Sequence, residues 1–552
     1  MMERVKKYIG YLTLGFLLCL INIEVSAETF TSNTTIAAGE HSYTDDLIVP
    51  SGITLTIESG AILRFDSGRK LQIDAGGYLI IQGTEQAPVL FTSSTASPGS
   101  WQGITVNGER SDGGDIQISY ATIEYANYGV YFSQGAKADI THSVIRNNNV
   151  GLYYYGARTG GTVHSSQLYN NQSGVYIYGG YNYLADHPKP VITGNSIYDN
   201  SAYNYRVVFY RDTNKTVLDA TGNWWGTTDL AVITGKIYDM VDDANSPSVD
   251  FSGLLASENG APVAGTVLTK AIVVDTIWSA TDGIIAQPIK VMSGSTLTIA
   301  AGTRFNAEGN SNLSVEAGGK LIIQGTEQAP VLFTSSTASP GSWQGITVNG
   351  ERSDGGDIQI SYATIEYANY GVYFSQGAKA DITHSVIRNN NVGLYYYGAR
   401  TGGTVHSSQL YNNQSGVYIY GGYNYLADHP KPVITGNSIY DNSAYNYRVV
   451  FYRDTNKTVL DATGNWWGTT DLAVITGKIY DMVDDANSPS VDFSGLLASE
   501  NGAPVAGTVL TKAIVVDTIW SATDGIIAQP IKVMSGSTLT IAAGTRFNAG
   551  EQ

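Results

Sequence analysis

Short runs of alternating apolar and polar residues recur along the chain at nearly even intervals. Each run closes on an aliphatic residue, and the spacings between these residues are 22, 23 and 29 positions (Ile123, Ile145, Leu168 and Ile197). Alternation predicts β-strands with one buried face, because successive side chains of a strand point to opposite sides. We therefore expect short strands over residues 118–123, 140–145, 163–168 and 192–197, and no stretch after residue 27 shows helical periodicity.

Other residues keep a fixed position relative to these runs. An asparagine stands three residues after three of the closing aliphatics, at Asn148, Asn171 and Asn200. Asparagine tolerates the left-handed backbone of a tight bend, and its amide can bond a neighbouring copy. The pattern predicts a coil whose strands stack in parallel about 4.8 Å apart. The aliphatic residues seven positions after the closing ones should also point inward: Val130, Leu152 and Val175.

A much longer repeat contains the short one. Residues 79–307 recur without a substitution as residues 321–549. A repeat of this length predicts tandem modules instead of one large domain. The expected organisation is a signal peptide at 1–27, a first module at 28–256, a linker at 257–269, a second module at 270–498, and a linker with the truncated start of a third module at 499–552.

The first 27 residues have the pattern of a secretory signal peptide. Arg4, Lys6 and Lys7 precede the apolar run 8–23, and Val25-Ser26-Ala27 is a small-residue cleavage site. The alternative is a membrane anchor, for which the run is short. The only cysteine, Cys19, lies within this segment, so the mature chain would contain no disulfide. We expect a secreted or cell-surface protein, cleaved near Ala27, with no membrane span in its mature form.

Composition narrows the class of protein and its partners. The net charge is −17, which argues against nucleic acid or an anionic membrane as a partner. Charged residues make up only 14% of the chain, while Gly (62) and Tyr (38) are abundant. This composition favours an all-β secreted protein.

Three phrases of the first module carry a resemblance to a known architecture. Residues 83–92, Trp101-Gln102-Gly103-Ile104 and Asn223-Trp224-Trp225-Gly226-Thr227 resemble parts of secreted bacterial right-handed parallel β-helix proteins, the pectate lyase-like architecture. The resemblance implies two right-handed parallel β-helices in tandem. Because the last coil of a β-helix exposes unpaired strand edges and core side chains, we expect at least one tryptophan of each pair, Trp224 with Trp225 and Trp466 with Trp467, to cover it. The resemblance does not imply one activity, because this fold carries lyases, hydrolases, epimerases, adhesins and passive surface proteins.

The best-known chemistry of this fold is cleavage of acidic polysaccharides by β-elimination. That reaction needs carboxylates that converge on Ca²⁺ and a nearby Arg or Lys that abstracts a proton. The candidates in the first module form no lyase motif, and scattered surface charge explains them better. They are Asp112, Asp115, Asp139, Lys137, Arg146 and Arg158.

Two further groups could carry chemistry. The acidic run 239–245 could bind Ca²⁺, but it lacks the spacing of a calcium loop, and we expect no bound metal or cofactor. His142 and His164 fall on successive coils, and His187 precedes a proline, as in alginate epimerases. For all three histidines, a surface position beside a bend is the favoured interpretation over catalysis.

The tyrosines are more informative than the charged residues. The eighth position after each closing aliphatic is always a tyrosine, and it should face solvent if the seventh faces the core. The resulting stripe predicts either a ladder that stabilises the coils or a platform for sugar rings. The asparagine at 204 breaks the aliphatic pattern, so the alignment of the last coil is doubtful. The candidate carbohydrate-binding residues are Tyr131, Tyr153, Tyr176 and Tyr205, with their twins Tyr373, Tyr395, Tyr418 and Tyr447.

Two functions remain open at this stage. The favoured one is a non-catalytic secreted or cell-surface rod, adhesive or in contact with an extracellular polysaccharide or surface glycan. The alternative is a lyase or epimerase that acts on acidic glycans. A carboxylate and a base that converge in a groove would favour the enzyme.

Overall fold

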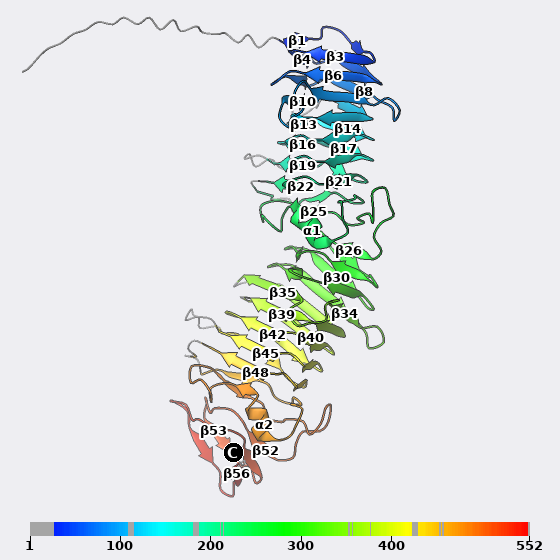
Figure 1. The fold of residues 1–552 in the computed structure, drawn as a ribbon. Coiled ribbons are helices and arrows are strands. Elements are labelled where there is room, and N and C mark those ends of the chain that lie inside the picture. Colours follow the sequence, from blue (N-terminus) through cyan, green and yellow to red (C-terminus); the bar gives the residue numbers. More distant parts are fainter. Residues whose placement is uncertain are drawn as a thin grey trace, which may run out of the picture.

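The computed structural model describes residues 27–108, 115–179, 187–209, 211–212, 215–351, 354–355, 357–375, 377–421, 429–451, 454 and 457–549. The expected signal peptide therefore lies outside the described residues, except for Ala27. The chain winds into two stacks of coils that follow one another along a bent rod (Figure 1). Each coil contributes a strand to parallel sheets that run the length of the stack, so the predicted all-β coil architecture is confirmed.

Three long sheets enclose the first stack, and the nine-stranded one carries the tyrosine positions. Its strands, in spatial order, are β1 (Ala27–Thr29), β4 (Asp46–Val49), β7 (Lys70–Ile73), β10 (Trp101–Asn107), β13 (Ala126–Ser133), β16 (Val150–Tyr155), β19 (Ser173–Tyr178), β22 (Tyr203–Val208) and β24 (Ile237–Tyr238).

The other two long sheets have seven strands each. One contains β2 (Thr34–Ile36), β5 (Thr54–Glu58), β8 (Tyr78–Gln82), β11 (Asp115–Ser119), β14 (Lys137–Thr141), β17 (Gly160–His164) and β20 (Val191–Ile192). The other contains β3 (Gly39–Tyr43), β6 (Ala61–Phe65), β9 (Val89–Ser93), β12 (Ala121–Glu124), β15 (Val144–Arg146), β18 (Gln167–Tyr169) and β21 (Ser196–Tyr198). Below them lie α1 (Leu230–Gly235) and the pair β23 (Val217–Asp219) and β25 (Ser248–Asp250).

The second stack repeats this arrangement. One sheet contains β26 (Thr266–Leu268), β28 (Gly283–Ile285), β31 (Arg304–Ala307), β34 (Val331–Thr334), β38 (Ala363–Glu366), β41 (Val386–Arg388), β44 (Gln409–Tyr411) and β47 (Ser438–Tyr440). A second contains β27 (Thr276–Trp278), β30 (Thr296–Ala300), β33 (Lys320–Gln324), β37 (Asp357–Ser361), β40 (Lys379–Thr383), β43 (Gly402–His406) and β46 (Val433–Ile434).

The third sheet of the second stack matches the nine-stranded sheet of the first. It contains β29 (Ile289–Val291), β32 (Asn312–Val315), β35 (Trp343–Glu351), β39 (Ala368–Ser375), β42 (Val392–Tyr397), β45 (Ser415–Tyr420), β48 (Tyr445–Val450) and β50 (Ile479–Tyr480), with β36 (Asp354–Gly355) paired to β35. The rest comprises α2 (Leu472–Thr476), β49 (Val459–Asp461), β51 (Ser490–Asp492), β52 (Thr508–Leu510), β53 (Thr518–Trp520), β54 (Gly525–Ile527), β55 (Leu539–Ile541) and β56 (Phe547–Ala549).

Aliphatic ladders fill the inside of the stack, as predicted. The closing aliphatics pair in register from coil to coil, and each is fully buried: Ile123, Ile145, Leu168 and Ile197. The residues seven positions later do the same on the nine-stranded sheet: Val130, Leu152 and Val175. The alternation read from the sequence therefore gives the correct phase for both sheets.

A buried asparagine ladder runs beside the aliphatic ladders. The side-chain oxygen of Asn171 accepts hydrogen bonds from the backbone N–H and the amide of Asn148, both at 3.0 Å. Asn200 does the same for Asn171. The predicted bonding between copies is confirmed, but the left-handed residues lie one position earlier, at Asn147, Asn170 and Asp199. The ladder asparagines satisfy buried backbone groups instead of forming the bend themselves.

The closing segment covers the end of the first stack. Trp225 is 3% exposed and lies edge-on to Phe251, with ring centroids 6.2 Å apart, so the predicted tryptophan cap is confirmed. The twin Trp467 is 2% exposed. Helix α1, which periodicity did not reveal, begins where Asp229 accepts hydrogen bonds from the N–H groups of Ala231 and Val232.

The two stacks are joined by a specific set of contacts. The Lys270 ammonium lies 2.6 Å from the Asp250 carboxylate, which also accepts a hydrogen bond from the Thr269 hydroxyl. Val267 lies in the hydrophobic core of the first stack. The end of segment 257–269 is therefore strand β26 and part of the joint. The same contacts recur between Asp492 and Lys512.

Candidate functional site

The nine-stranded sheet of the first stack displays tyrosines on its outer surface. Neighbouring strands β13, β16 and β19 pair in register, so Tyr131, Tyr153 and Tyr176 form one column. Each is half-buried between inward-pointing neighbours that are fully buried. Alternation along the strand thus places the three rings outside, as the sequence predicted.

The rings of this column contact one another. The centroids of Tyr131 and Tyr153 are 5.3 Å apart, and those of Tyr153 and Tyr176 are 4.9 Å apart with nearly parallel planes. Two further tyrosines, Tyr155 and Tyr178, form a second column in which the rings stack at 5.5 Å. Offset stacking of this kind stabilises neighbouring strands and leaves ring faces and edges at the surface.

One ring of this surface was not found by counting along the sequence. Tyr128 stacks on Tyr153 at 5.0 Å although its register partner is Val150. Tyr128 lies three residues before Tyr131, so it does not occupy the eighth position after a closing aliphatic residue. We call Tyr128, Tyr131, Tyr153, Tyr155, Tyr176 and Tyr178 the tyrosine face.

The expectation for the last coil is wrong. Tyr205 and its twin Tyr447 are fully buried, and Tyr205 pairs with the inward-pointing Val175. The turn between β21 and β22 contains one more residue than the equivalent turns, which shifts every later side chain to the other face. The side chain of Asn204 fills the extra space and accepts the ladder hydrogen bond from the Asn200 amide at 3.0 Å. Tyr205 and Tyr447 are therefore not part of a contact surface.

An arginine takes the place predicted for a tyrosine. Arg206 pairs with Tyr176, and its guanidinium carbon lies 4.7 Å from the centroid of that ring. Tyr203 and Tyr238 lie at 5.6 Å and 5.7 Å from the same atom. Three aromatic rings thus surround one cation at the lower end of the tyrosine face.

The tyrosine face carries no charge of its own. Burial, together with the neighbouring phenols of Tyr155 and Tyr128, raises the pKa of Tyr131 to about 12. Burial also raises the pKa of Tyr153, with Tyr176 as the strongest neighbour. The phenols of Tyr131 and Tyr153 therefore remain protonated at ordinary pH, and the centre of the face presents neutral rings and hydroxyl groups.

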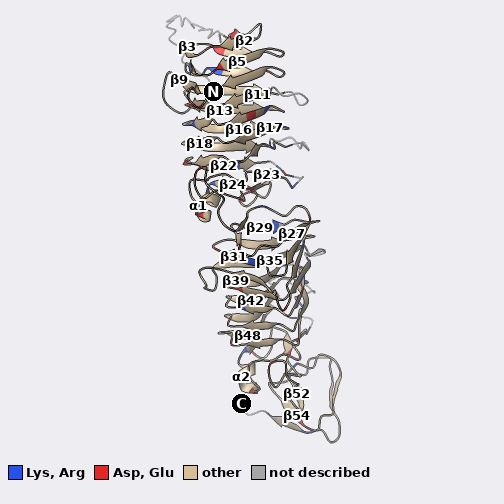
Figure 2. Cartoon of the chain, turned by 90° about the vertical axis from the view of Figure 1, so that its right-hand side faces the viewer, with Lys and Arg blue, Asp and Glu red and all other residues tan. Residues whose placement is uncertain are grey.

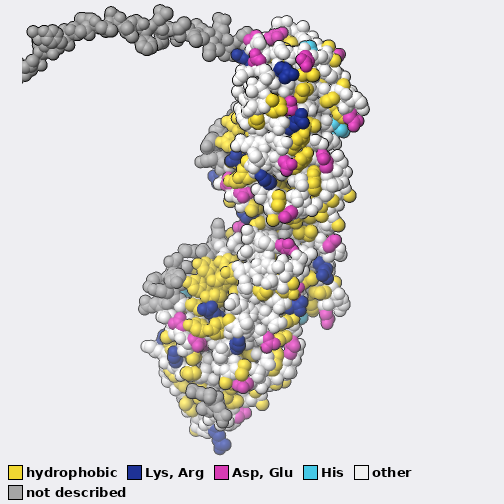
Figure 3. Space-filling view, viewed as in Figure 1, with side chains coloured by type: hydrophobic (Ala, Val, Ile, Leu, Met, Phe, Trp, Pro, Cys, Tyr) yellow, Lys and Arg dark blue, Asp and Glu magenta, His cyan; other side chains and the backbone are white. Residues whose placement is uncertain are grey.

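The second stack carries the same face with the same geometry. Its members are Tyr370, Tyr373, Tyr395, Tyr397, Tyr418 and Tyr420, and Arg448 lies 4.7 Å from the ring of Tyr418. Figure 3 shows hydrophobic side chains gathered over β39 and β42 on this flank of the second stack. The rod therefore displays two tyrosine faces in series.

The acidic and basic candidates do not meet in one site. Arg146 forms an ion pair with Glu124, with 3.0 Å between Nη2 and Oε2, so its guanidinium is already engaged. Lys137 and Asp139 lie exposed on β14, which belongs to a different sheet. Asp112 and the side chain of Asp115 lie outside the described residues, and Arg158 is exposed between β16 and β17. Figure 2 shows charged residues spread over both stacks.

The histidines occupy two different environments. His142 and His164 are exposed on successive coils with ring centroids 6.3 Å apart, and His142 stacks on Tyr120 at 4.8 Å. His187, expected at the surface, is 5% exposed and packs on Phe209 at 4.3 Å. That expectation is corrected, because the His187 ring packs on Phe209, which follows β22.

The acidic run 239–245 forms a hydrogen-bonded turn. Asp239 is 1% exposed and accepts hydrogen bonds from the N–H groups of Val241 and Val249 at 2.9 Å. Burial raises the pKa of Asp239 to about 6. Within the described part of the chain, no three His, Cys, Asp or Glu side chains gather closely enough to hold a metal ion.

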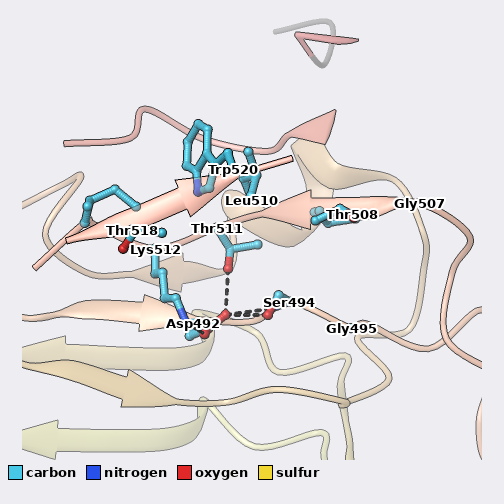
Figure 4. A pocket seen from close by; sticks show the side chains of 12 residues that line it. Asp492, Ser494, Gly495, Gly507, Thr508, Leu510, Thr511, Lys512, Thr518 and Trp520 are labelled. Atoms are coloured by element: carbon cyan, nitrogen blue, oxygen red, sulfur yellow. Dashed lines mark hydrogen bonds and ion pairs between the residues drawn. The ribbon is translucent and has the colours of Figure 1, made fainter. Parts of the chain in front are cut away.

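A hollow of about 370 Å³ lies beside the second joint (Figure 4). At its base the Asp492 carboxylate receives hydrogen bonds from the Thr511 and Ser494 hydroxyls and contacts the Lys512 ammonium at 2.5 Å. Burial alone would raise the pKa of Asp492, but Lys512 and Ser494 hold it below its usual value. Asp492, Ser494, Thr511 and Lys512 are therefore already bonded to one another as part of the second joint.

Comparison with protein families agrees with this geometry. Residues 78–223 match the model of the right-handed β-helix region, and residues 271–378 match the model of the pectate lyase-like β-helix domain. The chain is a right-handed parallel β-helix protein. The two matched segments fall in different stacks, so each β-helix is recognised separately. Neither α1 nor α2 has the length or apolar character to cross a bilayer, and the described residues contain no other helix.

Comparison with individual proteins adds little beyond the fold. No curated protein matches the β-helix chain. Among solved structures, the alginate lyase AlyGC of family PL6 is 10% identical, covering 93% of this chain and 97% of its own, with a TM-score of 0.30. A point mutant of the same lyase is 12% identical, covering 86% and 92%, with a TM-score of 0.25. Similarity this low carries no argument about activity.

Proposed function

We propose that this protein is a non-catalytic rod, secreted or at the cell surface, whose tyrosine faces contact a polysaccharide. The observation that carries the proposal is the column of neutral, half-buried rings on the outer surface of β13, β16 and β19. The apolar face of a sugar ring packs well on such rings, and the phenol hydroxyls can bond its hydroxyl groups. The proposed location follows from the signal-peptide pattern of residues 1–27.

The repeat supports a polymer as the ligand. The same face occurs on β39, β42 and β45 of the second stack, and the two stacks share a joint. A polysaccharide long enough to reach both faces would bind more tightly than either face alone, because the first contact raises the effective concentration of the second. A single sugar would gain nothing from the repeat.

The test is retention of the purified chain on insoluble polysaccharides. The variant carries Tyr153→Ala and Tyr176→Ala together with the twin changes Tyr395→Ala and Tyr418→Ala. Tyr78→Ala is the matched control, because Tyr78 is 42% exposed on a different sheet. We expect the fourfold variant to lose retention and the control to keep it. Equal retention of all three proteins would contradict the proposal and leave the rings as a structural ladder.

The alternative activity is tested in the same samples. A lyase acting on alginate or pectin would release unsaturated uronate ends, which absorb ultraviolet light. We expect no release with or without Ca²⁺. Release that depends on the chain would replace the rod with a polysaccharide lyase, and inversion of uronate residues without cleavage would indicate an epimerase.

A further inference from the structure

A groove separates the closing segment of the first stack from the opening coils of the second. Its volume is about 890 Å³, within the range of ligand sites in proteins. One wall comes from α1 and the turn after β24, and the other from β28 and the residues after β31. The groove shares no lining residue with the tyrosine faces, although β24 connects one of its walls to the sheet that carries the first face.

The floor of the groove is apolar. Ile237 and Ile285 lie at its base and are 3% and 1% exposed. Leu230, Ile284 and Ala286 line it while only partly buried against the core of the first stack. Apolar surface left open between two rigid walls favours a ligand with aliphatic groups.

The rims of the groove carry only negative charge. Among the lining residues, Asp229, Asp242 and Glu308 are charged, and no lining residue is Lys or Arg. Asp229 accepts hydrogen bonds through Oδ1, and Glu308 accepts one from the Ser336 hydroxyl through Oε1. Within the described residues none of the three is in an ion pair, so each can receive a cation.

A buried hydroxyl also lines the groove. Ser311 is 2% exposed, and its hydroxyl has no hydrogen-bond partner among the described residues. A hydroxyl removed from water is costly to leave unpaired and is satisfied when a ligand supplies a donor or acceptor. A peptide backbone supplies both.

We propose that this groove binds an extended basic peptide segment of a partner protein, in which Lys or Arg alternates with aliphatic residues. The long stems of Lys and Arg pack on apolar surface while their charged ends reach the solvent. The carboxylates at the rims meet those ends, the apolar floor meets the aliphatic residues, and the Ser311 hydroxyl bonds the peptide backbone. Because the walls belong to different stacks, the bound segment bridges the first joint.

The binding test uses the purified chain and fluorescently labelled peptides of alternating Lys and Leu, followed by anisotropy. A peptide of alternating Glu and Leu controls for apolar adhesion. We expect the lysine peptide to bind saturably and the glutamate peptide to fail. The double variant Asp242→Asn, Glu308→Gln should weaken binding about tenfold, the sum of two partly exposed ion pairs.

The matched control separates the groove from the general negative charge of the chain. Glu40→Gln with Glu85→Gln removes the same charge from exposed positions of the first stack and should leave the affinity unchanged. Ser311→Ala should weaken binding without altering its dependence on salt. Equal loss in both double variants, or equal binding of the two peptides, would overturn the proposal. Tighter saturable binding of a glucosamine oligomer at the same groove would also overturn it and indicate a cationic sugar instead.

Discussion

Glu124 and Arg146 lie on neighbouring coils, and their side chains form an ion pair of 3.0 Å in which the carboxylate is buried and the guanidinium is partly exposed. Glu124 also accepts a hydrogen bond from the Thr92 hydroxyl at 3.0 Å, and Arg146 donates one to the Tyr169 hydroxyl at 3.2 Å. The two residues face each other because β12 and β15 pair in register at this position.

Removing one partner of this pair should cost more than removing both charges. Arg146→Met leaves the Glu124 carboxylate buried without its cation, and we expect a loss of about 1–2 kcal/mol in the free energy of unfolding, since Arg146 is partly exposed. Adding Glu124→Gln should restore part of this loss. Urea unfolding of the single and the double variant measures the free energy of unfolding of each. A larger loss in the double variant would contradict a stabilising ion pair between Glu124 and Arg146.

A charge inside the aliphatic ladder should unfold one stack. Ile145 is fully buried between Ile123 and Leu168, so Ile145→Asp places an unpaired carboxylate in the core. The twin Ile387 remains intact in the second stack. We expect calorimetry to show one transition lost and one retained, whereas Ile145→Val should cost only about 0.5–1.5 kcal/mol. An unchanged thermogram for Ile145→Asp would show that Ile145 does not lie inside the aliphatic ladder.

The asparagine ladder should be sensitive at its middle rung. Asn171→Ala removes the acceptor for the buried N–H of Asn148 and the donor to the carbonyl oxygen of Ile145. Each unpaired buried group costs about 1–3 kcal/mol. We expect lower stability and faster hydrogen exchange at the Asn148 amide. Asn170→Ala, at the exposed neighbouring position, tests the left-handed backbone instead of the ladder.

Asp239 should give the closing segment of the first stack a dependence on pH between about 4 and 6. Burial raises its pKa in the folded chain to about 6, so the folded state binds a proton more tightly than the unfolded chain does. Its contribution to stability is present in full below the unfolded pKa of 3.8 and is lost as the pH rises through 6. We expect a loss of about 1–3 kcal/mol over this window. Asp239→Asn should remove this change when the free energy of unfolding is measured at a series of pH values. The same pH dependence in both proteins would contradict the prediction.

Sequence periodicity was sufficient to predict the coil, the buried ladders and the outward tyrosines of three successive coils. Alternation fixes which face a residue occupies wherever the turns have equal length, as from Ile123 to Leu168. It fails at Tyr205 because one extra residue between Asn200 and β22 reverses every later position, and spacing alone does not show which face the chain returns to.

Features built from several distant segments were also beyond the sequence. Helix α1 has only six residues, too few to produce a helical period. The groove between the stacks combines residues from both sides of the joint, and the ring of Tyr128 joins the tyrosine face through space instead of through register. None of these relations repeats with the spacing of the coils.

The joint formed by Asp250 and Lys270 recurs between Asp492 and Lys512, within stretches of identical sequence. The second module therefore carries the cation of one joint, Lys270, and the carboxylate of the next, Asp492. A duplication in the gene lengthens the rod by one fixed increment, and a deletion shortens it by the same amount, without a new interface having to evolve. The length of the rod can thus change in whole steps through recombination alone.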